Sequence, residues 1–315
     1  MCTSLTYQDL AGQPYLARTM DFPTTTSWRP IFIPRHFAWP TGVATIRNTH
    51  YAFLGGGRLP VHFATPLMAD GVNERGLACA ELYLPHAVHY QATVQSGAIN
   101  LSPQGFINWV LGEHASLAAV IADLPRVNLV AARWGGDDQV YPFHWLLSDR
   151  TGTSIVIEPT KTPLEAQPNS LGVLTNTPLL AEHLRRLRQL LDVPANATIE
   201  VLATAAQTWQ RRHELPSGPI PTTRFIHMAI RKLATPTLPP SATPSALFRW
   251  LAEVQLPYDP AKRDQVSHNY THYRAVIDLQ HLTYAFQART AHHVRTFQLT
   301  PAMAVNWQVP FVYHC

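Results

Sequence analysis

The hydrophobic pattern of the chain predicts strands towards both ends and two groups of helices between them. Alternating or continuous apolar runs indicate strands, which we place at 2–8, 15–20, 30–35, 44–47, 51–54, 76–84, 143–147, 154–157, 172–174, 271–279 and 283–288. Apolar residues at helical spacing predict helices, which we place at 103–111, 116–124, 178–191, 223–233 and 245–254. This order is typical of a layered α+β fold with mainly antiparallel sheets, and not of repeated βαβ units.

Two glycine-containing segments are predicted to be turns. The glycine triplet at 55–57 lacks the Lys-Ser or Lys-Thr pair of a phosphate-binding loop, so we expect a turn there and no nucleotide site. Segment 70–73, Asp-Gly-Val-Asn, has the composition of a turn as well. Both segments are therefore expected to separate strands.

The first 22 residues predict a β-hairpin. Turn formers occupy 9–14, and a turn centred near residue 11 pairs positions whose numbers add up to about 22. Cys2 then lies opposite Met20, and Arg18 and Asp21 return to its neighbourhood. An ordinary surface hairpin would show the same pattern, so the pairing alone does not indicate a function.

The composition excludes several classes of protein. The 315 residues are 46% hydrophobic and 14% charged, which favours a large core over disorder. The net charge is +4 without runs of like charge, and Arg185, Arg186 and Arg188 fall largely on the polar face of a predicted helix, so nucleic-acid binding gains no support. No stretch of 18 apolar residues occurs, which argues against a membrane span.

The cysteines and histidines do not predict a metal or a cofactor. Three cysteines, at 2, 79 and 315, are too few and too far apart for a disulfide framework or a zinc site. The 16 histidines form no set that a carboxylate or thiol completes, so none is expected to hold a metal. Cys79 lies in an apolar strand and is expected to be an inert thiol. The chain as written begins without a secretory segment, so we expect a cytoplasmic location.

A cysteine at position 2 can carry out distinctive chemistry. Removal of Met1 would leave Cys2 with a thiol and a free α-amine in one residue. A thiol with an ordinary pKa of about 8.5 needs a base at neutral pH, and an α-amine with a pKa of about 8 can be that base. Cys2 could thus supply both nucleophile and proton acceptor, although a cysteine at this position can also be incidental.

Further motifs make the second position informative. Cys2, together with Arg-Thr-Met-Asp-Phe at 18–22, resembles the start of the choloylglycine hydrolase family, which includes bile salt hydrolases and penicillin V acylases. Other matching stretches follow in the family's order, at 51–53, 70–77, 154–159, 172–178 and 223–225. The resemblance implies a single domain over 1–315 with the four-layer αββα sandwich of N-terminal nucleophile hydrolases.

The resemblance also implies a role for each matching polar residue. Cys2 would be the nucleophile, Arg18 would stabilise its thiolate, and Asp21 would orient the thiol and the amine. Asn176 would donate its amide to the oxyanion, and Arg224 would complete the polar cluster. Without the resemblance, an ion pair between Arg18 and Asp21 and a helix N-cap at Asn176 would explain the same residues.

The segment around Tyr83 favours one branch of the family. Bile salt hydrolases usually carry Asn where this chain has Tyr83, and penicillin V acylases usually carry Tyr. Tyr83 would offer its backbone N–H to the oxyanion and its ring to an apolar acyl group. The first expectation is therefore a penicillin V-type acylase that acts on a small N-acyl amide. A conjugated bile salt hydrolase and an acyl-homoserine lactone acylase remain the alternatives.

One segment of this chain departs from the family pattern, and the fate of Met1 leaves its activity open. Segment 209–218 lacks the family's Gly-Leu-Pro-Gly-Asp motif, which puts the pocket wall and the implied homotetramer in doubt. A chain that retained Met1 would be a ligand-binding member without catalytic activity. Intact mass therefore discriminates the enzyme from the binding protein.

Overall fold

The computed structural model describes residues 2–23, 27–43, 45–58, 66–133, 139–262, 265 and 268–314. The strands are β1 Thr3–Gln8, β2 Pro14–Phe22, β3 Arg29–Ile33, β4 Ala38–Pro40, β5 Ile46–Asn48, β6 Phe53–Arg58, β7 Leu67–Met68, β8 Asp70–Asn73, β9 Ala78–Tyr83, β10 Ile99–Leu101, β11 Val127–Leu129, β12 Phe143–Ser148, β13 Ser154–Ile157, β14 Ala166–Pro168, β15 Val173–Thr175, β16 Tyr270–Asp278, β17 Thr283–Ala288, β18 Arg295–Gln298 and β19 Phe311–Val312. The α-helices are α1 Phe106–Glu113, α2 Leu117–Asp123, α3 Leu180–Leu190, α4 Ile199–Gln210, α5 Pro221–Ala234, α6 Thr243–Glu253 and α7 Pro301–Asn306.

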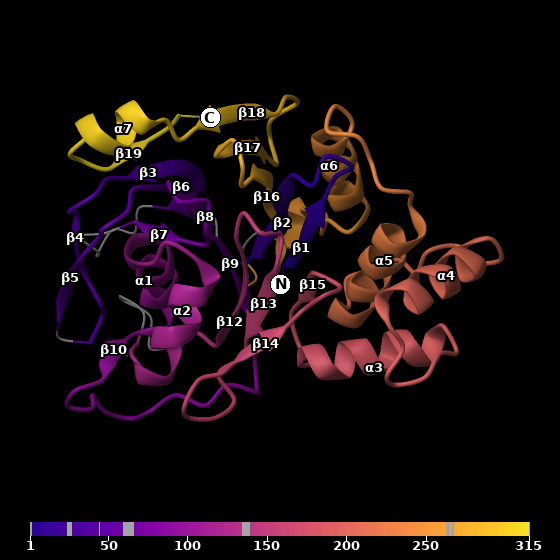
Figure 1. Ribbon diagram of the computed structural model, residues 1–315, viewed down its shortest axis with the longest axis horizontal. Helices are drawn as coiled ribbons and strands as arrows, with labels where there is room; N and C mark the ends of the chain where they lie inside the picture. The colour runs from indigo at the N-terminus through magenta and orange to yellow at the C-terminus, as the bar shows by residue number, and fades with distance from the viewer. Residues whose placement is uncertain are drawn as a thin grey trace.

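Two antiparallel sheets form the centre of the molecule. The six-stranded sheet has the order β15-β1-β2-β16-β17-β18, and the nine-stranded sheet has the order β14-β13-β12-β9-β8-β6-β3-β19 with β7 beside β6. Helix α1 contacts β8 and β9 of the larger sheet, whereas α5 and α6 contact strands of the smaller one. Figure 1 shows α1 and α2 on one side of the sheets and α3 to α6 on the other. The predicted α+β fold with four αββα layers is confirmed.

Strand β9 shows how the larger sheet separates two apolar cores. Successive side chains of a strand point to opposite faces. Ala78, Ala80 and Leu82 accordingly belong to the core that includes both sheets and α3 to α6, whereas Cys79 belongs to the core with α1 and α2. Cys79 is fully buried, as its apolar surroundings predict.

The predicted hairpin is confirmed with its register. Thr3 pairs with Thr19 and Gln8 pairs with Pro14, so that paired residue numbers add up to 22. The Asp9 carboxylate accepts hydrogen bonds from two backbone N–H groups in the connecting turn. Gly12 in this turn has φ +75°, which favours glycine. This turn sets the register that brings residues 18–21 back to Cys2.

Both predicted glycine turns are wrong, because both segments are strands. The triplet at 55–57 lies in β6, and 70–73 forms β8 beside it. A Cβ added at Gly55 would lie 1.9 Å from the Asp70 backbone oxygen, and one at Gly56 would lie 2.3 Å from the Tyr273 hydroxyl. Glycine at 55 and 56 therefore permits close approach of neighbouring groups, and the actual turn falls at Gly76 with φ +82°.

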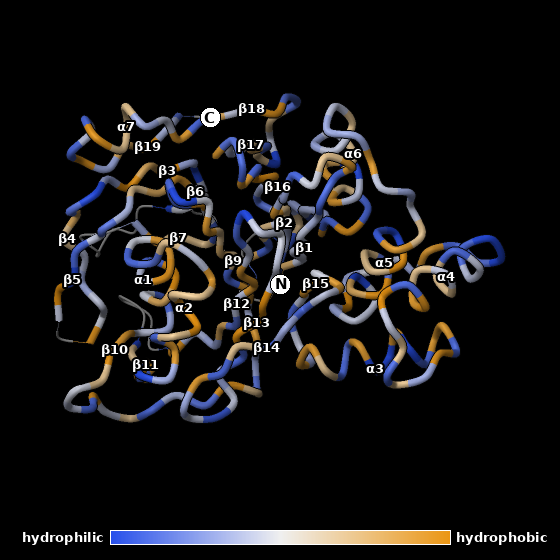
Figure 2. Tube along the Cα trace, in the orientation of Figure 1, coloured by the Kyte–Doolittle hydropathy of each residue, from blue (hydrophilic) through white to orange (hydrophobic). Residues whose placement is uncertain are grey.

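All five predicted helices are present, with shifted ends. Ser116 caps α2 by accepting a hydrogen bond from the Ala119 backbone N–H, as predicted. In Figure 2 the trace of α3 alternates between hydrophobic and hydrophilic positions, in agreement with its amphipathic pattern. Helices α4 and α7 were not predicted, and the predicted strand at 44–47 is β5, with residue 44 outside the described part. No helix in the described segments is both long and apolar enough to cross a membrane.

Candidate active site

Cys2 lies directly before β1 with its thiol against the returning strand of the hairpin. The residue is only 3% exposed. Its Sγ is 3.0 Å from Nη2 of Arg18, which donates to it, and 3.7 Å from the backbone oxygen of Asp21. The hairpin thus places a positive group beside the sulfur.

A buried network holds the Arg18 guanidinium in place. Asp70 lies 3.4 Å from Arg18, and both side chains are fully buried. The hydroxyls of Tyr273 and Tyr284 donate to the same carboxylate, Tyr284 at 2.7 Å. Burial acts to lower the pKa of Arg18, but the charges of Cys2, Tyr273 and Asp70 outweigh it and raise the pKa. Arg18 therefore stays charged beside the sulfur.

The Asp21 carboxylate is held between β16 and α5. The Thr271 hydroxyl donates to one oxygen at 2.6 Å, and the Thr19 hydroxyl donates to the other at 3.2 Å. Nη1 of Arg224 lies 3.6 Å from the second oxygen, and both side chains are almost completely buried. These contacts fix the carboxylate on the side of Cys2 that faces α5.

Asn176 and Arg224 complete the surroundings of Cys2. The backbone nitrogen of Cys2 donates to the Asn176 side-chain oxygen, and the Asn176 amide donates to the Tyr83 backbone oxygen at 2.7 Å. Nη2 of Arg224 donates to the same Asn176 oxygen at 3.1 Å, and Nη1 donates to the backbone oxygen of Cys2 at 2.9 Å. The two side chains therefore bracket the main chain of Cys2.

All six predicted site residues meet around the thiol or the pocket beside it. Arg18 and Asp21 come from β2, Tyr83 from the end of β9, Asn176 from the residue after β15, and Arg224 from α5. Met1 lies outside the described residues, so the predicted removal of Met1 stays a prediction. Within the described residues, no group of three His, Cys, Asp or Glu side chains could hold a metal ion.

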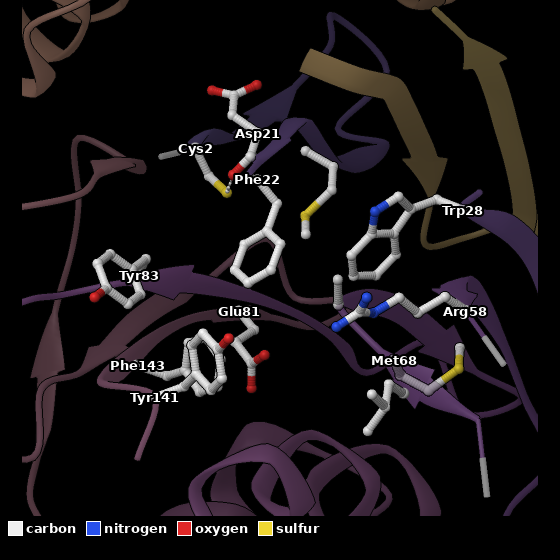
Figure 3. Close-up of a pocket in the computed structure, with 13 residues that line it drawn as sticks. Cys2, Asp21, Phe22, Trp28, Arg58, Met68, Glu81, Tyr83, Tyr141 and Phe143 are labelled. Carbon is white, nitrogen blue, oxygen red and sulfur yellow. Dashed lines mark hydrogen bonds between the residues drawn. The ribbon is translucent and has the colours of Figure 1, made fainter. Parts of the chain in front are cut away.

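A largely apolar pocket opens beside the sulfur. Its cavity volume is about 30 Å³, and its lining residues are Cys2, Met20, Asp21, Phe22, Trp28, Arg58, Leu67, Met68, Ala69, Glu81, Tyr83, Tyr141 and Phe143. Figure 3 shows Cys2 and Asp21 on one side of this space and Glu81, Tyr141 and Phe143 on the opposite side. Burial raises the pKa of the Tyr83 hydroxyl, which keeps its ring neutral. The largely apolar lining suits an uncharged, apolar acyl group next to the thiol.

Sequence reasoning missed several residues of this site. Asp70 fell in a segment predicted to be a turn, and Tyr273 and Tyr284 lay in strands with no sign of a function. Their contacts join residues more than 200 positions apart, which no local pattern reveals. Glu81 did give a signal, because it is the only charged residue in the apolar strand 76–84.

The architecture and the site together define a class of protein. Four αββα layers with a cysteine beside the first strand are the features of an N-terminal nucleophile hydrolase. The model of the linear amide C–N hydrolases, choloylglycine hydrolase family, matches residues 2–307. The chain belongs to this family, whose members hydrolyse amide bonds other than peptide bonds.

Individual relatives carry names from both branches of the family. A bile salt hydrolase/transferase from Clostridium perfringens is 34% identical over 235 residues, which cover 73% of this chain and 71% of that protein. A penicillin V acylase from Pectobacterium atrosepticum is 22% identical over 302 residues, 93% of this chain and 79% of that protein. A solved mutant of the Clostridium perfringens conjugated bile acid hydrolase has a TM-score of 0.80 and 25% identity, covering 100% of this chain and 97% of that chain.

These similarities bear on the predicted substrate. Relatives named for bile salts reach higher identity than the penicillin V acylase. The comparisons therefore do not specifically support the acylase that the Tyr83 segment favoured. They fit the alternative, a conjugated bile salt hydrolase, better.

Proposed function

We propose that the chain is a cysteine amidohydrolase that cleaves a linear N-acyl amide through a thioester on Cys2. The observation that carries this proposal is the Cys2 sulfur 3.0 Å from Arg18, beside an apolar pocket. The sulfur attacks the amide carbonyl, a C–S bond forms, and the C–N bond breaks. The thiol proton passes through the α-amine of Cys2 to the leaving amine, and water then releases the acyl group as a carboxylic acid.

The neighbours of Cys2 have complementary roles in this proposal. Arg18 stabilises the thiolate, while Asp21 and Arg224 fix the main chain and the α-amine. The Asn176 amide has two N–H groups, and one of them is used by the Tyr83 backbone oxygen. The second N–H and the backbone N–H of Tyr83 serve the developing oxyanion. Loss of one such donor typically costs about 3 kcal/mol of transition-state stabilisation.

For the substrate, we favour conjugated bile salts, the amides of a bile acid with glycine or taurine. The support is the greater similarity to relatives named for bile salts, together with the apolar pocket beside Cys2. Penicillin V is the second candidate, and the specific observation in its favour is Tyr83 with the motif at 18–22. An acyl-homoserine lactone with a long apolar acyl chain is a third.

Turnover of competing substrates tests this choice. Purified protein is assayed with glycocholate, taurocholate, penicillin V and an acyl-homoserine lactone under one set of conditions. We expect kcat/KM for glycocholate or taurocholate to exceed that for penicillin V by at least about tenfold, about 1.4 kcal/mol of transition-state binding. Faster cleavage of penicillin V would reverse the order, and no cleavage of any amide by protein without Met1 would contradict the proposed activity.

A binding protein is the competing proposal from a different class. Retention of Met1 would tie up the nitrogen of Cys2 in a peptide bond and remove the proposed base. The chain would then bind acyl amides in the pocket without hydrolysing them. Intact mass spectrometry distinguishes the two, because the enzyme is lighter by one methionine.

A further inference from the structure

Glu81 places a carboxyl group inside the apolar pocket. The residue lies on β9, is 7% exposed, and lines the same space as Cys2. Figure 3 shows its carboxyl group close to Tyr141 and Phe143, across the pocket from Cys2. Carboxyl groups are rarely buried unless they are paired, so this position calls for a partner.

The protein supplies only part of that partner. Nε1 of Trp145, the cross-strand neighbour, donates to Oε2 of Glu81 at 3.1 Å. Within the described part of the chain, no other hydrogen bond and no ion pair reaches the Glu81 carboxyl group. Oε1 is thus left without a described partner.

The surroundings favour the uncharged acid. Burial raises the pKa of Glu81 well above its usual range, and the Trp145 hydrogen bond and the Arg18 charge counteract this only partly. Since the indole N–H occupies Oε2 as an acceptor, the acid proton belongs on Oε1. Because Glu81 lines the pocket, this O–H donor is available to an acceptor on a molecule bound there.

We propose that Glu81 is a specificity-determining residue whose neutral carboxyl group donates a hydrogen bond to an uncharged oxygen on the acyl part of the substrate. This inference rests on the proposed function, since it requires the acyl group to occupy the pocket beside Cys2. A carbonyl, hydroxyl or ether oxygen would satisfy the Oε1 proton. A purely hydrocarbon acyl group would leave that proton unpaired, so a site of this kind discriminates against it.

Matched substrates test the proposal. The plain substrate is N-octanoylglycine, and the others are five oxo derivatives, isomers of one another, with one oxo group at position 3, 4, 5, 6 or 7 of the acyl chain. We expect at least one oxo isomer to exceed the plain substrate in kcat/KM by about tenfold or more in the wild-type protein. Equal kcat/KM for all isomers and the plain substrate would overturn the role of Glu81.

Three variants identify the residue responsible. Glu81→Leu removes the donor, and we expect the preference for the oxo substrate to fall to about twofold or less. Glu81→Gln keeps an N–H donor of similar shape and should retain part of the preference. Glu113→Gln changes a carboxylate that pairs with Arg47 away from the pocket, so its preference should match the wild type. A Glu81→Leu protein that kept the full preference would overturn the proposal.

The pH dependence gives a second readout. The groups whose charges reach Glu81 are Arg18 on β2, Cys79 on β9 and the Tyr90 hydroxyl, and Arg58 lines the same pocket. Because titration near Cys2 affects both substrates, the ratio of their kcat/KM values isolates Glu81. In the wild type this ratio should fall as pH rises through the raised pKa of Glu81, whereas in Glu81→Gln it should stay constant. If the wild-type protein kept its full preference for the oxo substrate up to pH 10, with an unchanged ratio of kcat/KM values, the neutral carboxyl group of Glu81 could not be the donor.

Binding separates this inference from the proposed hydrolysis. Calorimetry on Cys2→Ala, alone and combined with Glu81→Leu, measures Kd for the plain and oxo substrates without turnover. If Cys2→Ala binds the oxo substrate more tightly and Glu81→Leu removes this preference, the proposed role of Glu81 is supported even if the wild type hydrolyses neither compound. Hydrolysis of both compounds without any preference in kcat/KM or Kd rejects Glu81 and leaves the proposed function intact.

Discussion

Two cysteines in this chain show how surroundings decide the reactivity of a residue. The Cys2 sulfur lies 3.0 Å from the Arg18 guanidinium and lines the pocket. Cys79 is fully buried on the other face of the larger sheet, and burial raises the pKa of its thiol well above the usual range. Of these two sulfurs, only that of Cys2 contacts a guanidinium group and lines the pocket.

Alanine at either position tests this contrast. Cys2→Ala removes the nucleophile, and we expect kcat/KM for the preferred amide to fall by at least about 1,000-fold with the fold intact. Cys79→Ala is the matched control and should keep kcat/KM within about threefold of the wild type. Hydrolysis rates and circular dichroism of both variants provide the readout. Undiminished turnover by Cys2→Ala would refute the assigned nucleophile.

The sequence predicted the residues that a motif carries and missed those that only the fold brings together. Cys2, Arg18 and Asn176 stand in recognisable stretches of sequence. In the structure, Arg18 and Asn176 both form hydrogen bonds with Cys2. Asp70 reaches Arg18 through a strand that looked like a turn, because the segment Asp-Gly-Val-Asn also suits a strand in which Gly71 has close backbone neighbours. The pairing of Tyr273 and Tyr284 with this carboxylate has no local signature.

At the scale of elements, turn chemistry determined what the sequence could predict. The β1–β2 hairpin was predicted with its register, because a short turn fixes which residues pair. Helix α4 was missed, since only Leu202 and Ala206 of its residues are buried and the apolar stripe is narrow. Its Thr198 N-cap was the available signal.

Helix α5 offers a test in which two arginines have opposite surroundings. Arg224 is 1% exposed and reaches Cys2, Asn176 and Asp21, whereas Arg231 pairs with Glu253 near the surface. Arg224→Met should lower the free energy of unfolding by about 3 kcal/mol, because it leaves a buried carboxylate without its cation.

The control for that variant lies two turns along the same helix. Arg231→Met should cost less than about 1 kcal/mol, as expected for a partly exposed ion pair. Urea titrations of the two variants and the wild type measure both values. Equal destabilisation by the two substitutions would contradict the structural role of Arg224.

His183 on α3 predicts a dependence of stability on pH. It is fully buried, its Nε2–H donates to the Asn176 backbone oxygen at 2.9 Å, and its ring stacks on Phe225. Burial lowers its pKa from 6.5 to about 4, so the unfolded chain binds more protons between these values. Stability is therefore lost as pH falls from 6.5 towards 4, by up to about 3 kcal/mol.

Urea denaturation at several pH values checks this expectation. His183→Gln cannot take up that proton, so its stability should fall less steeply than that of the wild type between pH 6.5 and 4. His272, whose pKa burial also lowers to about 4, should keep part of the slope in the variant. Identical slopes for wild type and variant would rule out the buried neutral state of His183.

At the scale of the whole molecule, the layered fold assembles the site from distant parts of the chain. Residues 2, 18–21, 83, 176 and 224 come from both sheets and from the helical layer outside the smaller one. The layered architecture could be predicted from the order of the expected elements together with the family resemblance. The substrate ranking was not predicted correctly, because the Tyr83 segment is a local feature, and relatives matched over most of the chain favour bile salts instead.

The central claim is that one residue supplies both the attacking sulfur and the base. Mass spectrometry of protein quenched in acid during turnover tests it most directly. We predict a chain lighter by one methionine that carries the acyl group as a thioester on the peptide with Cys2 at its start. Rapid turnover by a chain that still carries Met1, or an acyl group on any other residue, would contradict the account.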